Sequence, residues 1–398
     1  MLTNVSGNVQ RLPLAAFILL ELLAAIDVSG VTVLVPTLQS DFSLSNSQTS
    51  WILSAYLLPF AIFIVPLGVL IDRLNIPQRM LRLSALGFAL GSLTCALSDN
   101  MWIFFFARAV KGVCAAGIFT SQFTIILKYW RHPHRAVEIV LIGTAVGLFL
   151  GPLLGAWTAH ALWWRLFFGA GTIVALIAAA SSMSIDKMVP VLGKESIPPE
   201  KFLFAESVKT IFKSGAWGFV LHFVLSFSLV GANLIVTIHL QQTMKAAPDV
   251  NGWALATVAA GMAFQNVAGI GSRFFRTVDR AAVIGVMSWG GLLAALAFRS
   301  SLCDSPAIAI YFFLGMALGL ALSAVDIVIL EKVPVQRLAL ASALITMVMQ
   351  GAMALSVEIL PLLYWHFGLH VLVAMGLFCV IIGGIAVAWQ LHAAEGES

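Results

Sequence analysis

Apolar stretches of bilayer-crossing length recur along nearly the whole chain, and this pattern restricts the fold more than any other feature. A helix needs roughly 20 mainly apolar residues to cross the hydrocarbon of a membrane. Such stretches lie near residues 13–36, 48–71, 82–98, 101–126, 136–159, 162–184, 215–241, 250–272, 281–299, 305–329, 337–361 and 369–392. Barrel strands would instead alternate over about ten residues. We therefore predict an all-α integral membrane protein with twelve transmembrane helices.

The charged residues that remain indicate how the helices are oriented. Only 10% of the residues are charged, whereas soluble domains carry about 25%. With a cytoplasmic N-terminus, the outer loops keep only Arg165, Lys245 and Arg299, and the inner loops hold the other loop Lys and Arg residues. Because positive loops stay inside, we predict a multi-pass protein of the bacterial inner membrane with both termini cytoplasmic. The formal net charge of +4 then reflects topology and requires no nucleic-acid partner.

The longest polar stretch divides the predicted helices into two equal sets. It covers residues 185–213 and carries Pro190 and five lysines. Six helices on each side of a basic loop are typical of secondary transporters built from two pseudo-symmetric halves. We therefore predict a six-helix bundle over 1–184, a central cytoplasmic loop over 185–213, and a second six-helix bundle over 214–398.

The loop after the second predicted helix carries the first family signature. Gly68, Asp72 and Arg73 follow the spacing G-x-x-x-D-R, and Asn75 comes two residues later. This segment resembles the loop signature of the major facilitator superfamily, in which a glycine occupies the position of Asn75. Asn tolerates a left-handed backbone better than most other residues, so the exchange is mild. The resemblance implies that Asp72 and Arg73 form a gate motif on the cytoplasmic side.

The first and fourth predicted helices extend the resemblance. Arg108 and Lys111 resemble the family pattern R-x-x-Q-G, with Lys in place of Gln. Asp27, nine residues before Pro36, resembles the first-helix motif of the drug:proton antiporter branch, whose usual members have fourteen helices. The resemblance is close over roughly residues 18–170. It implies transport of organic compounds coupled to protons.

The fifth predicted helix carries Gly147, Gly151, Pro152 and Gly155. Small residues at this spacing let two helices approach closely, and a proline inside a helix removes one backbone hydrogen bond and bends it. The set resembles the motif that marks exporters in the superfamily. We therefore expect export, and we expect an added side chain at Gly151 to crowd a neighbouring helix.

Ionisable residues also lie inside the predicted spans, at Glu21, Asp27, Arg108, Lys111, Asp326 and Glu358. A charge at membrane depth costs roughly 2.5–3.5 kcal/mol, so it faces a partner or a watery cavity. Asp27 and Lys111 both lie nine residues from an outer helix end, at ~13 Å depth. Pairing of Asp27 with Arg108 or Lys111 is therefore reasonable. Asp27 is either a proton-coupling residue, whose replacement by Asn abolishes transport without unfolding the protein, or half of a static ion pair.

Three further acids are candidates for proton coupling. Glu21 lies ~9 Å deeper than Asp27 and about 120° around the helix, where it binds a second proton or faces the cytoplasmic vestibule. Asp326 lies near the inner end of its helix and either couples protons or extends to cytoplasmic water. Glu358 lies near the outer end of its helix and either couples protons or extends to the water on that side. Four uncharged residues line a substrate path or hydrogen-bond between helices, namely Gln122, Asn233, Gln265 and Gln350.

Together these features predict a secondary active transporter that exports a drug-like or amphipathic organic molecule in exchange for protons. A dedicated exporter of an endogenous metabolite such as a siderophore is the alternative, and import is less favoured because of Gly151 and Pro152. The chain has no G-x-S-x-G or H-E-x-x-H motif, so we predict no enzyme. We expect no metal site, no cofactor and no nucleic-acid partner. We expect the lipid bilayer, protons and the organic substrate to be the partners of a monomer.

Overall fold

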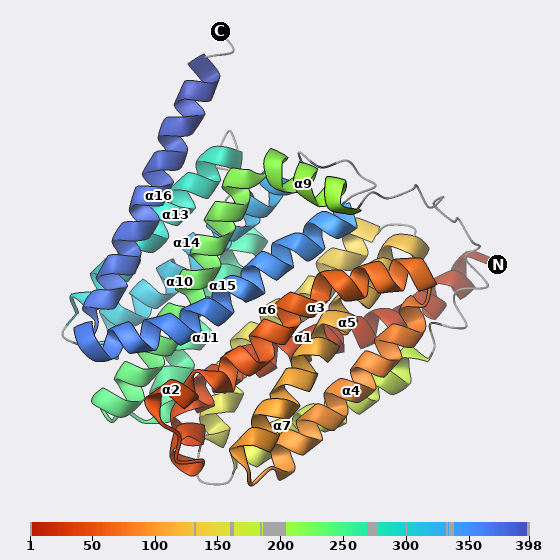
Figure 1. Cartoon of the computed structure of the whole chain (residues 1–398), viewed down its shortest axis with the longest axis horizontal. Helices are drawn as coiled ribbons and strands as arrows, with labels where there is room; N and C mark the ends of the chain where they lie inside the picture. Colours follow the sequence, from red (N-terminus) through yellow and green to blue (C-terminus); the bar gives the residue numbers. More distant parts are fainter. Residues whose placement is uncertain are drawn as a thin grey trace. The chain divides into compact units, whose positions relative to one another are not determined.

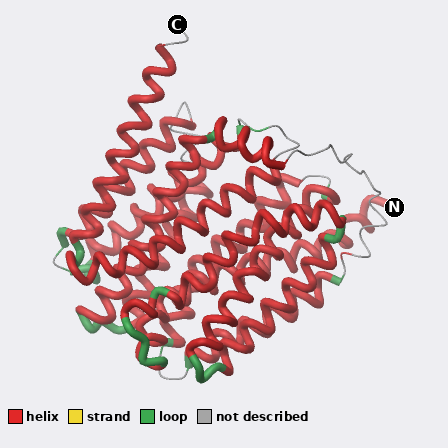
Figure 2. Tube along the Cα trace, viewed as in Figure 1, coloured by secondary structure: helices red, strands yellow, loops and turns green. Residues whose placement is uncertain are grey.

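The computed structural model describes residues 2–130, 133–159, 163–183, 185, 204–268, 278–299, 301–331, 333 and 338–395. These residues form helices joined by short loops, and no strand occurs among them (Figures 1 and 2). In a bilayer no water satisfies the backbone, so each spanning segment must form its own hydrogen bonds, which a helix does. The chain divides into two compact units, residues 1–203 and residues 204–398.

The first unit contains seven helices among its described residues. They are α1 (Leu2–Asp41), α2 (Asn46–Thr49), α3 (Trp51–Leu74), α4 (Pro77–Leu97), α5 (Met101–Tyr129), α6 (Pro133–Thr158) and α7 (Trp164–Ser182). All but the one-turn α2 coincide with the first six apolar stretches predicted from the sequence.

The second unit contains six long helices and two short helical segments in its described part. They are α9 (Phe204–Ser214), α10 (Ala216–Ile238), the π-helical turn η1 (His239–Thr243), α11 (Pro248–Ala268), α13 (Val278–Ala297), α14 (Ser305–Leu330), α15 (Leu338–Phe367) and α16 (His370–Glu395). The predicted central loop 185–213 lies mostly outside the described residues, and its last part is helical in α9. The predicted domain boundaries themselves stay a prediction.

The prediction of an all-α membrane fold is confirmed. Ten of the described helices are long and apolar enough to cross a bilayer. The other two predicted spans correspond to α11 and α16. Helix α11 is not among the ten, and the described apolar part of α16 is the shorter His370–Ile385.

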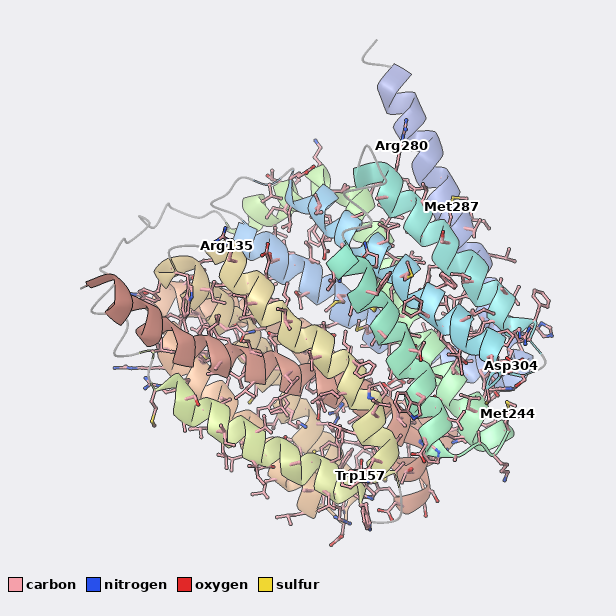
Figure 3. All side chains as sticks on the ribbon, turned by 180° about the vertical axis from the view of Figure 1, so that it is seen from behind. Arg135, Trp157, Met244, Arg280, Met287 and Asp304 are labelled. Atoms are coloured by element: carbon pink, nitrogen blue, oxygen red, sulfur yellow. The ribbon has the colours of Figure 1, made fainter. Side chains whose placement is uncertain are left out.

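Large apolar side chains cover the outer surfaces of the helices, as contact with lipid requires. Phe106 is 71% exposed, Trp157 58% and Ile62 61%. Charged residues such as Arg135 and Arg280 lie instead near helix ends (Figure 3). A soluble protein would not expose so many large hydrophobic residues over its helices.

The two units repeat one pattern of helix pairing. In the first, α1 packs on α6 and α7, α3 on α5, and α4 on both α5 and α7. In the second, α10 packs on α15 and α16, α11 on α14, and α13 on both α14 and α16. When only the six long helices of each unit are counted, the first therefore pairs with the fifth and sixth, and the fourth with the second and third. This repetition is the pseudo-symmetry that the sequence predicts.

Candidate functional site

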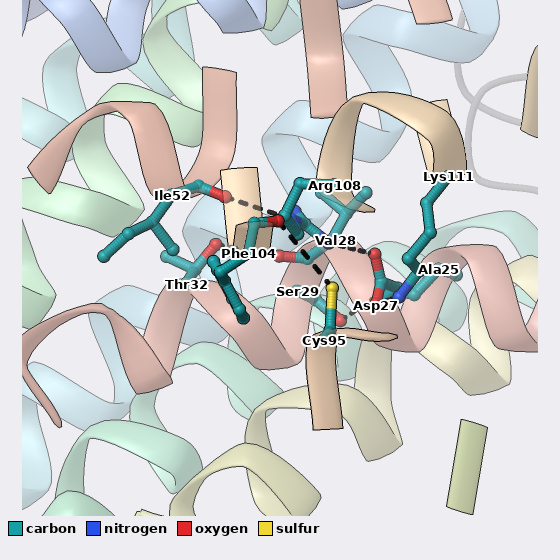
Figure 4. A network of polar contacts seen from close by, with 10 residues as sticks. All are labelled: Ala25, Asp27, Val28, Ser29, Thr32, Ile52, Cys95, Phe104, Arg108 and Lys111. Atoms are coloured by element: carbon teal, nitrogen blue, oxygen red, sulfur yellow. Dashed lines mark hydrogen bonds and ion pairs between the residues drawn. The ribbon is translucent and has the colours of Figure 1, made fainter. Parts of the chain in front are cut away.

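The centre of the first unit holds a buried cluster of one acid and two bases. Asp27 of α1 contacts two residues of α5, because Arg108 Nη1 donates to Oδ2 and Lys111 Nζ donates to Oδ1 (Figure 4). Arg108 and Lys111 are three residues apart and so share one face of the helix. All three residues are at most 3% exposed. The sequence predicts one of these two pairings, and the structure contains both.

Neighbouring helices complete the surroundings of the two bases. Arg108 Nε donates to the Ile52 carbonyl oxygen at 3.0 Å, and its guanidinium carbon lies 4.7 Å from the centre of the Tyr56 ring. Lys111 Nζ lies 4.7 Å from the centre of the Phe88 ring and 4.9 Å from that of Phe168. Arg108 Nη2 and the Tyr56 hydroxyl are buried without a hydrogen-bond partner among the described residues. With all three groups ionised, the cluster carries two positive charges against one negative charge.

A second buried acid, Glu21 on α1, has only neutral partners among the described residues. Gln122 Nε2 of α5 donates to Glu21 Oε1, and Thr144 Oγ1 of α6 donates to Oε2 at 3.1 Å. Glu21 is 8% exposed, so in this structure it lies inside the bundle. Gln122 thus makes a hydrogen bond between helices, one of its two predicted roles, and its role in a substrate path stays a prediction. Its own Oε1 is buried and has no hydrogen-bond partner among the described residues.

The glycines of α6 form a seam against α1. A Cβ atom built on Gly147 would lie 2.5 Å from the Leu22 carbonyl oxygen, and one on Gly155 would lie 2.4 Å from that of Gly30. A Cβ atom on Gly151 would lie 2.1 Å from Ser29 Oγ. The sequence predicts that a side chain at Gly151 would crowd a neighbouring helix, and in the structure that helix is α1. The same helix carries the buried acids Glu21 and Asp27. Pro152 is buried inside α6, within the same seam.

The predicted gate motif lies where α3 ends. Asp72 and Arg73 are exposed in the last turn, and Asn75 follows with a left-handed backbone at φ 52°. Lys128 of α5 lies 4.0 Å from Asp72 Oδ1, and its Nζ donates to Asn75 Oδ1 at 3.3 Å. Gly68 of α3 is in ordinary contact with α5, because a Cβ atom there would lie 3.7 Å from Thr120.

We expect Asp72→Ala to slow transport several-fold without weakening the binding of a transported compound. Asp72 lies sixteen residues beyond Tyr56 on α3, which is ~24 Å along the helix axis from the buried cluster. The change therefore acts on the end of the bundle and leaves the cluster intact. Binding measured by calorimetry and transport measured in proteoliposomes separate the two effects. A large loss of affinity with normal turnover would contradict this prediction.

The second unit holds a contact between an acid and a histidine on the corresponding helices. Asp326 Oδ1 of α14 lies 3.2 Å from His222 Nδ1 of α10, and the side chains are 41% and 3% exposed respectively. Asp326 is thus partly exposed and contacts a buried histidine, and both interpretations of Asp326 stay predictions. Glu358 on α15 is half-buried. The three remaining predicted path residues are dispersed, with Gln265 and Gln350 buried on α11 and α15 and Asn233 half-buried on α10.

Sequence reasoning missed two histidines. His222 pairs with Asp326, and His239 in the π-helical turn shares the Tyr364 hydroxyl with Thr243, each at 2.9 Å. One signal was present, since residues 214–244 contain no Asp, Glu, Lys or Arg. His222 and His239 are the only residues of this stretch with an ionisable side chain.

The sequence profile of the Major Facilitator Superfamily matches residues 17–357. The chain belongs to this superfamily. This is a superfamily of transporters and not of enzymes, in agreement with the class that the sequence predicts.

Named relatives resemble the chain over part of its length. The colistin resistance protein EmrB of Acinetobacter baumannii is 26% identical over 178 residues, which are 44% of this chain and 35% of that protein. A multidrug resistance protein B homolog of Mycobacterium tuberculosis is 32% identical over 40% of this chain and 30% of its own length. The matches thus span about a third of these relatives. An uncharacterized MFS-type transporter of Bacillus subtilis, YceJ, is 27% identical over 68% of both chains.

Solved transporter structures show the same fold. A bacterial homolog of the human lysosomal transporter Spinster superposes with a TM-score of 0.72 at 18% identity, covering 94% of this chain and 95% of its own. A POT family transporter superposes with a TM-score of 0.76 at 12% identity over 95% and 96%. At these identities the likeness concerns the fold alone.

Proposed function

We propose that this transporter exports an organic small molecule in exchange for protons, and that Glu21 binds the coupling proton. The observation that carries the proposal is the burial of Glu21 among neutral partners, Gln122 and Thr144. An acid that takes up a proton there becomes neutral, which a low-dielectric site accommodates without a counterion. Asp27, by contrast, contacts a base with each oxygen.

The amide of Gln122 suits a partner that changes its protonation state. Its NH₂ group donates to the carboxylate in this structure, and its Oε1 lacks a hydrogen-bond partner among the described residues. An amide can present either a donor or an acceptor. After a flip, Oε1 would accept a hydrogen bond from protonated Glu21. The pair can therefore be satisfied in both states, which a reversible proton site requires.

The direction and substrate class rest on resemblance. The relatives from Acinetobacter and Mycobacterium carry names of resistance proteins, and an efflux pump of Dothistroma septosporum is 34% identical over 37% of this chain. These names favour the drug:proton antiporter branch and a drug-like compound over a dedicated metabolite exporter. We propose that the two units rock so that the buried acids face each side in turn. In this proposal the loop with Asp72 is cytoplasmic, and the other acids, Asp326 and Glu358, are secondary candidates.

The test is the variant Glu21→Gln in proteoliposomes containing a pH-sensitive dye. A panel of neutral, anionic and cationic organic compounds is added under a pH gradient, and proton movement is recorded with compound flux. We expect compound-dependent proton release for the unmodified protein. We expect none for Glu21→Gln, because the amide cannot bind a proton, while exchange of compound at equal concentrations persists.

Glu138→Gln is the matched control, because Glu138 is an exposed acid on α6. It should couple protons as the unmodified chain does. Normal proton-coupled transport by Glu21→Gln would refute the assignment of Glu21. The absence of compound-dependent proton movement in the unmodified protein, with flux intact, would refute proton exchange altogether.

A further inference from the structure

We propose that the Lys111 ammonium occupies a site that would otherwise bind an organic cation, so that the transporter accepts neutral and anionic compounds and excludes cations. The inference rests on the proposed export function and specifies the substrate class. It makes Lys111 a specificity-determining residue.

The surroundings of Lys111 are those that recognise a substituted ammonium ion. Its Nζ contacts Asp27 Oδ1 and lies 4.7 Å and 4.9 Å from the centres of the Phe88 and Phe168 rings. Aromatic faces within about 6 Å attract a cation, and pockets of this kind bind quaternary ammonium ligands. Four helices contribute, namely α1, α4, α5 and α7. The chain thus builds a cation site and fills it with its own side chain.

The neighbouring helix α4 is shaped around the stem of this lysine. A Cβ atom built on Gly91 would lie 2.6 Å from Lys111 Cγ and 3.5 Å from Cδ. Only glycine leaves this space open. Gly91 and Phe88 are three residues apart, so one face of α4 provides both the room for the stem and a ring beside the ammonium group. Lys111 is 1% exposed, so its whole side chain is enclosed by the neighbouring helices.

A mobile cation would meet two obstacles at this site. The tethered ammonium competes with it at an effective concentration of roughly millimolar or more. Arg108 already contacts the other oxygen of Asp27, so a third cation would add to an existing excess of positive charge in a low-dielectric site. A cation therefore gains little from Asp27 while Lys111 is present.

Unsatisfied donors in the same cluster favour a different ligand group. Arg108 Nη2 and the Tyr56 hydroxyl are buried and have no hydrogen-bond partner among the described residues. The guanidinium nitrogen can only donate, and a buried donor without an acceptor is costly. A carbonyl, ether or carboxylate oxygen would satisfy it. Neutral and anionic compounds carry such acceptors without adding positive charge.

The experiment is a gain of binding in Lys111→Gln, which removes the charge and leaves a polar side chain that is one atom shorter. The probes are phenyltrimethylammonium and its uncharged isostere tert-butylbenzene, with binding measured by calorimetry on the purified full chain in detergent. We expect Lys111→Gln to bind phenyltrimethylammonium at least about tenfold more tightly than the unmodified protein does. We expect tert-butylbenzene to bind the variant and the unmodified protein with the same affinity.

Three variants make the result specific. Lys111→Arg keeps a cation in the site and should bind no better than the unmodified chain. Lys128→Gln makes the same chemical change at the far end of α5 and should also show no gain. Lys111→Gln combined with Asp27→Asn should lose the gain, because the carboxylate is then absent. Lys111→Met is a second neutral variant in case Lys111→Gln folds poorly.

Each contrary outcome overturns the inference. Three results would show that Lys111 does not fill a cation site. The unmodified chain could bind the ammonium probe as tightly as Lys111→Gln does, or the gain in affinity could survive the addition of Asp27→Asn. Both neutral variants could also fold and fail to bind the probe. The measurement needs no pH gradient and no transport. Failure of proton coupling by Glu21 therefore leaves this result unaffected, and the reverse also holds.

Discussion

Asp27→Asn is expected to abolish transport and to lower the free energy of unfolding by about 3–5 kcal/mol, the range for removing one partner of a buried ion pair. The carboxylate is the only acid that contacts Arg108 and Lys111 among the described residues. Its removal leaves two buried cations facing each other without a counterion. Unfolding of the purified protein in detergent, followed by calorimetry, measures the stability, and proteoliposomes measure transport per folded molecule.

A partial rescue separates charge from other effects of this substitution. Asp27→Asn combined with Lys111→Gln leaves one buried cation instead of two, so it should recover part of the lost stability. Asp99→Asn is the matched control, because Asp99 pairs with Arg165 at an exposed position and should change stability little. Stability of Asp27→Asn equal to that of the unmodified chain would contradict the prediction. The sequence alone predicts only that the variant stays folded, because an amide keeps the size and hydrogen bonding of the carboxyl group.

The fold could be predicted from the sequence because each spanning helix satisfies its own backbone and needs its own apolar stretch. The residues at which the helices begin and end could be predicted less well. The apolar stretch 13–36 lies inside α1, which runs from Leu2 to Asp41, and hydropathy does not show where a helix continues beyond the hydrocarbon. The helical end of the central segment, α9, was missed because that segment reads as polar and rich in proline.

The candidate site could be predicted only in part. Helix rise places Asp27 and Lys111 at one depth, because depth depends on counting residues from a helix end. The rotation of each helix about its axis depends on packing, which a single sequence does not reveal. Contacts that depend on rotation therefore escaped prediction. The sequence leaves open whether Gln122 lines a substrate path or makes a hydrogen bond between helices, and it does not identify Glu21, 101 residues away along the chain, as its partner. It likewise does not pair His222 with Asp326.

Gly155→Ala is expected to destabilise the first unit by about 1–3 kcal/mol, the usual cost of overpacking, despite the better helix propensity of alanine. The added Cβ would meet the oxygen, carbon and Cα of Gly30 at 2.4, 3.0 and 3.1 Å, and all three are backbone atoms of α1. Backbone atoms cannot rotate away, so α1 and α6 must separate. Such separation would also displace Asp27 and Glu21, which α1 carries, and transport should fall with stability.

The neighbouring glycines provide a graded comparison. At Gly151 the closest atom to an added Cβ is Ser29 Oγ at 2.1 Å, with backbone atoms only at 3.1 Å. Because the serine side chain can rotate, Gly151→Ala should cost less than Gly155→Ala. At Gly169 on α7 no described atom lies within 4 Å of the Cβ position, so Gly169→Ala should be neutral or stabilising. Melting temperatures of the three purified variants test this order. If Gly155→Ala and Gly169→Ala changed the melting temperature equally, α1 and α6 would be able to move apart at little cost. The close approach of these helices would then not explain why glycines occupy the positions on α6.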